Sequence, residues 1–122
     1  MAKKILVIDD EPDMIKMVAG RLAKAGYLVI QAVNGKMGLD LLPIEKPDMV
    51  LLDLAMPGLD GEAVCRAIKA DNATKNLPVM LFTASTARPL SDRAREMGAD
   101  DYISKPFDAK ELMGKIKKLL GE

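Results

Sequence analysis

The chain has 122 residues, with 18 Lys and Arg against 18 Asp and Glu, one Cys and no His. A chain of this length fits a single domain, which we place at residues 1–122. Because His is absent, His-based catalytic triads, Cys–His nucleophile pairs and His-ligated zinc or iron sites are excluded. The zero net charge and the 3% aromatic content favour neither direct nucleic-acid binding nor attraction to an anionic membrane.

Neither an export signal nor a membrane span is visible. No signal-peptide pattern follows Met1, and no apolar run exceeds four residues. A spanning helix needs about 20 mostly apolar residues, so we expect a cytoplasmic protein that does not cross a membrane. The single Cys65 falls on an apolar helical face beside Val64 and Ile68, which indicates a reduced structural thiol.

Five apolar segments bounded by polar or turn residues predict β-strands. Three of them are uninterrupted and suit strands that are buried on both faces: residues 5–8, 49–52 and 79–82. The other two contain polar residues and suit the edges of a sheet: residues 28–33 and 102–104.

Helical patterns follow each predicted strand. The first covers residues 12–25, with Pro12 suited to a first turn and Gly26 to the position after the last turn. The last begins after Asp108, which with Glu111 forms an Asp variant of the capping box. Three further helices are predicted at residues 35–42, 61 to about 71, and about 90–97. Methionines within these patterns are expected at or near the core: Met14, Met17, Met80 and Met113.

The alternation of strands and helices predicts the fold class. Five βα units with short connections require parallel strands and right-handed crossovers. We therefore expect an α/β protein, a three-layer sandwich around a doubly wound five-stranded parallel sheet. The flavodoxin-like order 2-1-3-4-5 fits best, because it places the two interrupted strands at the edges.

Polar residues directly follow four of the predicted strands. They are Asp9, Asp10 and Glu11 after the first strand, Asp53 after the third, Thr83 after the fourth and Lys105 after the fifth. In such sheets ligands bind beyond the carboxyl ends of the strands, so these side chains are expected to converge.

Each of these residues has an ordinary alternative, such as a helix cap for an Asp or a solvated surface charge for the lysine. Together they are harder to explain in that way, because several carboxylates at one sheet edge repel each other unless cations compensate. A Mg²⁺ ion and the lysine would provide that compensation.

Four motifs follow the predicted strands: Ile8-Asp9-Asp10-Glu11, Asp53-Leu54-Ala55-Met56-Pro57-Gly58-Leu59-Asp60-Gly61, Thr83-Ala84, and Tyr102 with Lys105-Pro106-Phe107. In this order and spacing they resemble the receiver domain of two-component response regulators, of the chemotaxis-regulator-like, single-domain kind. The resemblance runs from about residue 4 to residue 120.

The resemblance implies that Asp53 accepts a phosphoryl group from a phosphohistidine of a sensor histidine kinase or phosphotransfer protein. It also implies that Asp10 and Asp53 hold Mg²⁺ directly, together with the backbone carbonyl of Ala55, while Asp9 acts mainly through bound water. The lysine of the family motif, here Lys105, would bind a phosphoryl oxygen after transfer. The protein is then a signalling switch that catalyses its own phosphorylation and dephosphorylation, rather than an enzyme acting on another substrate.

The resemblance further implies a switch. Thr83 would donate its hydroxyl to the new phosphoryl group, and Tyr102 would turn inward and reshape the surface of the fourth helix, fifth strand and fifth helix. The downstream protein target is not legible from the sequence. The chain is expected to be a monomer or a phosphorylation-dependent dimer, and a single-domain regulator rather than an excised receiver.

Three other classes of protein fit the sequence less well. Phosphatases of the haloacid dehalogenase type require a second acid two residues after the nucleophile, where this chain has Ala55. A flavodoxin needs a hydroxyl-rich phosphate loop after the first strand, where Asp9, Asp10 and Glu11 would repel phosphate. A phosphorylation-independent interaction module is disfavoured by the complete set of acids. The small residues Ala55 and Ser85 lead to the hypothesis that the phosphorylated state is short-lived.

Overall fold

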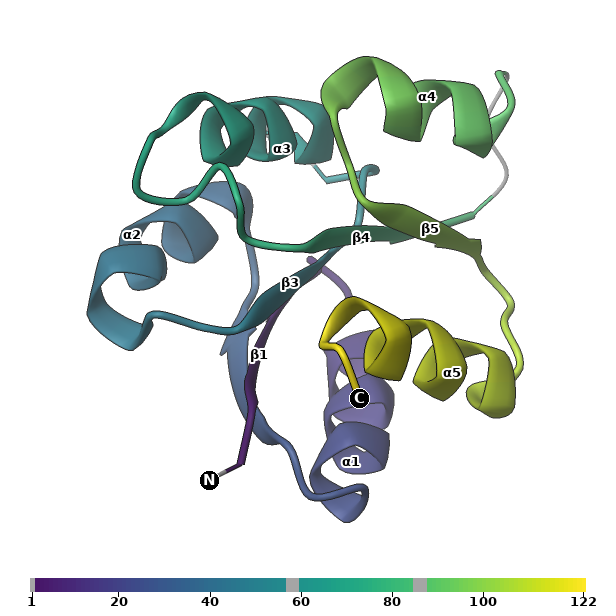
Figure 1. The fold of residues 1–122 in the computed structure, drawn as a ribbon. Coiled ribbons are helices and arrows are strands. Elements are labelled where there is room, and N and C mark those ends of the chain that lie inside the picture. Colours follow the sequence, from purple (N-terminus) through teal and green to yellow (C-terminus); the bar gives the residue numbers. More distant parts are fainter. Residues whose placement is uncertain (1, 57–59, 85–87) are drawn as a thin grey trace.

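The computed structural model describes residues 2–56, 60–84 and 88–122 (Figure 1). Within these residues, five parallel strands form one sheet in the order β2-β1-β3-β4-β5, which confirms the predicted topology. The strands are β1 (Lys4–Ile8), β2 (Leu28–Ala32), β3 (Met49–Leu52), β4 (Val79–Thr83) and β5 (Asp101–Ser104).

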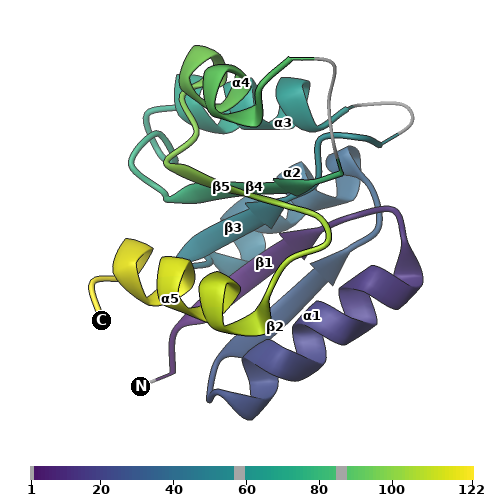
Figure 2. The same cartoon turned by 90° about the vertical axis from the view of Figure 1, so that its right-hand side faces the viewer.

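Five helices cover the two faces of this sheet (Figure 2). They are α1 (Pro12–Lys24), α2 (Gly35–Glu45), α3 (Gly61–Ala70), α4 (Leu90–Met97) and α5 (Ala109–Leu119). Helices α1 and α5 pack on one face, and α2, α3 and α4 pack on the other. The three-layer doubly wound architecture predicted from the sequence is therefore confirmed. None of the helices in the described segments is long and apolar enough to cross a membrane.

The three central strands carry the core. Successive residues of a strand point to opposite faces, so in β1 Ile5 and Val7 contact the α1–α5 layer, while Leu6 and Ile8 contact the α2–α4 layer. All four of these side chains are fully buried. Burial on both faces explains why the central strands are uninterrupted apolar runs, without alternation. The edge strand β2 is partly exposed, as its interrupted pattern predicted.

Helix α2 is longer than the sequence predicted. It continues beyond residue 42 through Pro43 to Glu45. Pro43 occupies the last turn, where its missing N–H removes only one helical hydrogen bond. The helix closes at Lys46, which adopts a left-handed conformation (φ 48°) and donates its N–H to the Leu42 carbonyl.

The predicted position of Gly26 after the last turn of α1 is confirmed, with φ 98°. Two other local predictions need correction. Met17 is 47% exposed, because it lies on the side of α1 that faces away from the sheet. The capping box of α5 is only half formed: Asp108 accepts a hydrogen bond from the Lys110 N–H, but within the described residues the Glu111 side chain does not bond back to Asp108.

Candidate functional site

Two aspartates lie side by side where β1 and β3 end. Asp9 follows β1 directly, and its N–H donates to the Ala32 carbonyl at 3.1 Å. Asp53 follows β3, and its N–H donates to the Ile8 carbonyl at 3.0 Å. These backbone bonds continue the sheet by one residue beyond each strand. They therefore place both carboxylates at the same carboxyl edge of the sheet.

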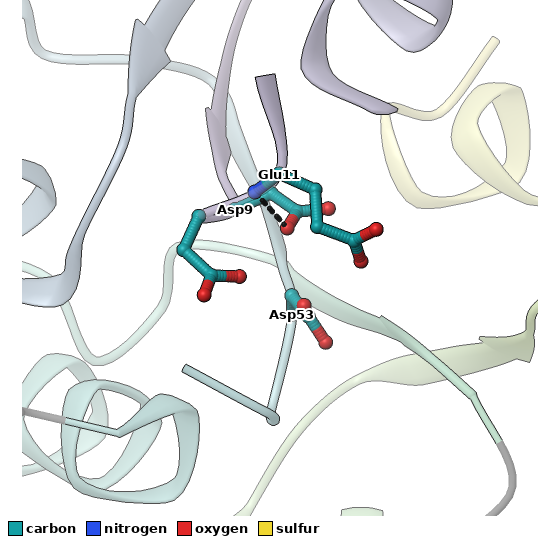
Figure 3. Close-up of side chains that lie close together, drawn as sticks. Asp9, Glu11 and Asp53 are labelled. Atoms are coloured by element: carbon teal, nitrogen blue, oxygen red, sulfur yellow. Dashed lines mark hydrogen bonds between the residues drawn. The ribbon is translucent and has the colours of Figure 1, made fainter. Parts of the chain in front are cut away.

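Four acidic side chains gather at this edge. Carboxylate oxygens of Asp9, Asp10, Glu11 and Asp53 all lie within 4.8 Å of one another. Figure 3 labels three of them, with Asp9 and Glu11 beside Asp53. Asp9 is fully buried and Asp53 is 1% exposed, whereas Asp10 is half-buried and Glu11 is exposed. The cluster thus has a buried floor and an open side.

Hydrogen bonds from backbone N–H groups two residues further along the chain orient the two buried carboxylates. One oxygen of Asp9 accepts the Glu11 N–H at 3.0 Å. One oxygen of Asp53 accepts the Ala55 N–H at 3.1 Å. In each case the second carboxylate oxygen faces Lys105. These hydrogen bonds hold the Asp9 and Asp53 side chains in place and leave one oxygen of each carboxylate directed into the cluster.

Lys105 supplies the positive charge of the site. Its Nζ lies 3.1 Å from Asp9 Oδ2, 3.4 Å from Asp53 Oδ2 and 3.4 Å from Glu11 Oε1. Its side chain is 10% exposed and its backbone N–H donates to the Thr83 carbonyl at 2.7 Å. The ammonium also lies 4.7 Å from the ring centroid of Phe82, a cation–π contact.

The pKa values of two residues of the site are raised, for different reasons. Burial raises the pKa of Asp9 to about 6, against the lowering effects of the Glu11 N–H and Lys105. Burial alone lowers the pKa of Lys105, but the hydrogen bond that Lys105 donates to Asp9 and the charges of Asp53, Asp9 and Glu11 outweigh it and raise that pKa. The two buried carboxylates of Asp9 and Asp53 therefore carry an excess of negative charge that Lys105 only partly balances.

The remaining predicted residues follow β3, end β4 or lie within β5. Thr83 ends β4, next to β3 in the sheet, and is 2% exposed. Ala55 is exposed, two residues after Asp53. Tyr102 lies in β5, half-buried against the α2–α4 layer, with Lys115 Nζ 5.3 Å from its ring centroid. Ser85 lies outside the described residues, as does the segment 57–59 of the second motif.

Three contacts of the site were not predicted. Glu11 was expected to converge with the other acids, as it does, but its ion pair with Lys105 was not foreseen. Phe82 packs under the lysine, which an apolar strand residue does not reveal. Gly61 begins α3 so close to Asp53 that a Cβ would overlap the Asp53 carbonyl oxygen. Only its position at the start of a helix was visible in the sequence.

The geometry can be compared with known proteins. The family model described as "Response regulator receiver domain" matches residues 5–117 of this chain. The chain belongs to the response regulator receiver domain family. It is therefore a receiver domain of two-component signalling, with the flavodoxin-like arrangement of strands that its relatives share.

Individual relatives agree with this assignment. The receiver domain is 39% identical over 117 residues to the DNA-binding dual master transcriptional regulator RpaA of Synechocystis, covering 96% of this chain and 48% of RpaA. It superposes on the crystal structure of a response regulator from Chloroflexus aurantiacus with a TM-score of 0.94 and 31% identity, covering all of both chains. It superposes on the structure of the chemotaxis protein CheY4 of Vibrio cholerae with a TM-score of 0.90 and 25% identity. This superposition covers 98% of this chain and 99% of CheY4.

The curated relatives are longer proteins. The chain covers 48%, 45% and 52% of three of them, and so spans about half the length of the curated relatives that it matches. The names of all three relatives refer to transcriptional regulation: RpaA, ycf27 of Guillardia theta and the phosphate regulon protein PhoB of Pseudomonas aeruginosa. The shared portion is the receiver domain.

Proposed function

We propose that this receiver domain accepts a phosphoryl group on Asp53 from a phosphohistidine of a sensor histidine kinase or phosphotransfer protein. The observation that carries the proposal is the position of Lys105, 3.4 Å from Asp53 and 3.1 Å from Asp9. A cation beside a buried carboxylate provides the charge neutralisation that an incoming phosphoryl group needs.

The donor set fits Mg²⁺. Hard carboxylate oxygens from the acidic cluster lie within 4.8 Å of one another, on a site that is open on one side. Mg²⁺ prefers a few carboxylates and completes its shell with water and phosphate oxygens. Asp10 and Asp53, with the carbonyl of Ala55, would hold the ion, and Asp9 would act through a bound water. When bound, Mg²⁺ would neutralise the charge that develops on the phosphoryl oxygens.

The chain's own residues account for the rest of the reaction. A carboxylate oxygen of Asp53 attacks phosphorus, a P–O bond forms, the P–N bond of phosphohistidine breaks, and the imidazole nitrogen keeps the electron pair. Lys105 then binds a phosphoryl oxygen as a point charge. Phosphoryl transfer depends mainly on positioning and charge neutralisation, so no histidine is needed on this side. Hydrolysis of the aspartyl phosphate at the same site returns the switch to its resting state.

The switching step would use Thr83 and Tyr102. Phosphorylation adds a charge of about −1.5 to −2 and strong acceptor oxygens, to which the Thr83 hydroxyl can donate. Because Thr83 also accepts the Lys105 N–H through its carbonyl, its movement is linked to the segment that leads from β5 to α5. Rotation of Tyr102 would then reshape the α4–β5–α5 surface, to which a downstream protein binds. The receiver domain would act as a monomer or as a phosphorylation-dependent dimer, and it would do so in the cytoplasm.

The test is the mass of the intact protein after incubation with acetyl phosphate and Mg²⁺. A gain of one phosphoryl group, about 80 Da, is expected. The gain should be lost in Asp53→Asn and when EDTA removes the metal ion. Asp60→Asn is the matched control, because Asp60 caps α3 through the Ala63 N–H and is not part of the acidic cluster.

Two outcomes of the mass measurement would contradict the proposed phosphorylation of Asp53. A mass gain that persists in Asp53→Asn would place the acceptor on another residue. No gain with acetyl phosphate or with a panel of phosphorylated histidine kinases, although Mg²⁺ binds, would contradict the proposal and favour a phosphorylation-independent module.

A further inference from the structure

A groove lies between α1 and α5, which are neighbours on one face of the sheet (Figures 1 and 2). It has a volume of about 510 Å³. Four basic residues line it: Arg21 and Lys24 from the last turn of α1, and Lys110 and Lys117 from α5. No acidic residue lies among the lining residues.

These four cations have no partner in the parts of the chain that the structure describes. Ion pairs among the described residues engage the basic side chains of Lys4, Lys36, Arg66, Lys69, Arg88, Arg93, Arg95, Lys105 and Lys115. None of the groove cations is among them. The lining of the α1–α5 groove is therefore positive, and the acids next to it are Asp108, which accepts the Lys110 N–H, and Glu122, which donates its N–H to the Lys117 carbonyl.

The α5 side of the groove permits close approach by another molecule. Gly114 lies in the interior of α5, where Gly is less favourable for the helix than Ala. A Cβ at this position would have no neighbour within 4 Å, so packing inside the domain does not require Gly. Its neighbour Met113 is half-buried and adds an apolar surface that can adapt to a partner. A glycine that the domain itself does not need is consistent with a backbone that another molecule approaches closely.

We propose that the α1–α5 groove binds an acidic amphipathic helix of a partner protein. The apolar face of that helix would lie over Met113 and Gly114, and its carboxylates would meet the four cations on the rim, a helix-in-groove mode of recognition. A protein partner fits better than nucleic acid, because the groove has no aromatic residue for base stacking. It also fits better than a membrane, because Met113 is the largest apolar side chain in the lining.

This inference stands apart from the proposed phosphoryl transfer. None of the groove residues belongs to the acidic cluster or contacts Lys105. Charge-reversed groove variants should therefore gain the same mass with acetyl phosphate as the unmodified domain. If Asp53 were not labelled by acetyl phosphate, the peptide could still bind to the groove. If the peptide did not bind to the groove, Asp53 could still be labelled.

The experiment is a titration of the ¹⁵N-labelled domain, followed by amide chemical shifts. The probe is a synthetic amphipathic peptide of Glu, Ala and Leu, about five helical turns long. Shifts are expected at residues 21–25 and 109–117, and binding should weaken as salt is added. Arg21→Glu with Lys117→Glu should weaken binding about tenfold, since two attractions become repulsions. Lys24→Glu with Lys110→Glu should act similarly, and Gly114→Ala should weaken binding without a change of charge.

The matched control is Lys46→Glu with Lys75→Glu. It makes the same change of net charge on two lysines outside the groove for which the described part of the chain also provides no ion pair. Equal weakening by this control, or shifts centred elsewhere, would overturn the groove assignment. Tighter binding of a DNA duplex or of vesicles containing anionic lipid than of the peptide, at the same salt concentration, would overturn the choice of a protein partner.

Discussion

The ammonium nitrogen of Lys105 lies 3.1 Å from Asp9 Oδ2, although 96 residues separate the two positions in the chain. Asp9 follows the central strand β1, whereas Lys105 follows the edge strand β5, and the lysine reaches across the end of the sheet to it. The same ammonium lies 3.4 Å from Asp53. One cation therefore offsets the mutual repulsion of the buried aspartates.

Changes to the two partners should have opposite effects on stability without Mg²⁺. Lys105→Met leaves the buried carboxylates uncompensated, and should lower the free energy of unfolding by about 3 kcal/mol. Asp9→Asn removes a buried negative charge next to Asp53, and should raise the free energy of unfolding by about 1 kcal/mol. Urea denaturation in EDTA measures both. A loss of stability in Asp9→Asn comparable to that in Lys105→Met would contradict this account of the site.

Gly61 should be required for the geometry of the acceptor. A Cβ at Gly61 would overlap backbone atoms of Asp53 and Leu54, which cannot move without displacing the Asp53 carboxylate. Gly61→Ala should cost about 3 kcal/mol of stability and abolish labelling by acetyl phosphate.

The control for this prediction is Gly38→Ala. Its Cβ would meet the side chain of Ile8, which can adopt another rotamer. It should lower stability by about 1–2 kcal/mol and retain labelling. Normal labelling of Gly61→Ala would show that the close contact does not position Asp53.

The lifetime of the phosphorylated state should depend on Ala55. This residue is exposed two positions after Asp53, so its small side chain leaves the acceptor open to water. Ala55→Arg should shield the phosphoryl group and slow the release of phosphate by about tenfold, which corresponds to about 1.4 kcal/mol in the barrier. Phosphate release after rapid removal of the donor measures the rate. An unchanged rate would refute the hypothesis of a short-lived state.

The ionisation of Tyr27 should be linked to folding. Burial and the 2.6 Å hydrogen bond that its hydroxyl donates to Glu122 raise the pKa of Tyr27 to about 12. Between pH 10 and this value the folded chain keeps a proton that the unfolded chain releases, so stability should fall as pH rises through that range.

The tyrosinate absorbance reports this ionisation directly, because the chain has two Tyr and no Trp. Tyr27→Phe should remove the late step of the titration and lower stability at neutral pH by about 1 kcal/mol. Ionisation of Tyr27 at its ordinary pKa of 10.0 would contradict the prediction.

The thiol of Cys65 should be unreactive in the folded domain. It is fully buried between α3 and α4, with Sγ 3.5 Å from the Met97 carbonyl oxygen, and burial raises its pKa to about 11. Alkylation should be about 1,000-fold slower than in the denatured chain, since it requires opening of the structure. Comparable rates in both states would show that this layer opens freely. The chain has one Cys, so the total rate is that of this residue.

The sequence alone determined the parts of this protein that depend on local pattern. Uninterrupted apolar runs marked β1, β3 and β4, because only strands covered on both faces dispense with alternation. The βα repeat implied parallel strands and right-handed crossovers, and so the order of the sheet. The residues after each strand had to converge, since parallel strands end at the same edge, and this brought Asp53 and Lys105 together in the prediction.

Only the tertiary structure decided what depends on distance between separate elements. The contact of Lys105 with Glu11 and with the ring of Phe82 follows from the register of the sheet and the lengths of loops, which no local pattern encodes. The packing of the Gly61 helix start against Asp53 has the same origin. Which cations of α1 and α5 have no ion pair among the described residues also depends on the fold, because the tertiary structure decides which charges meet.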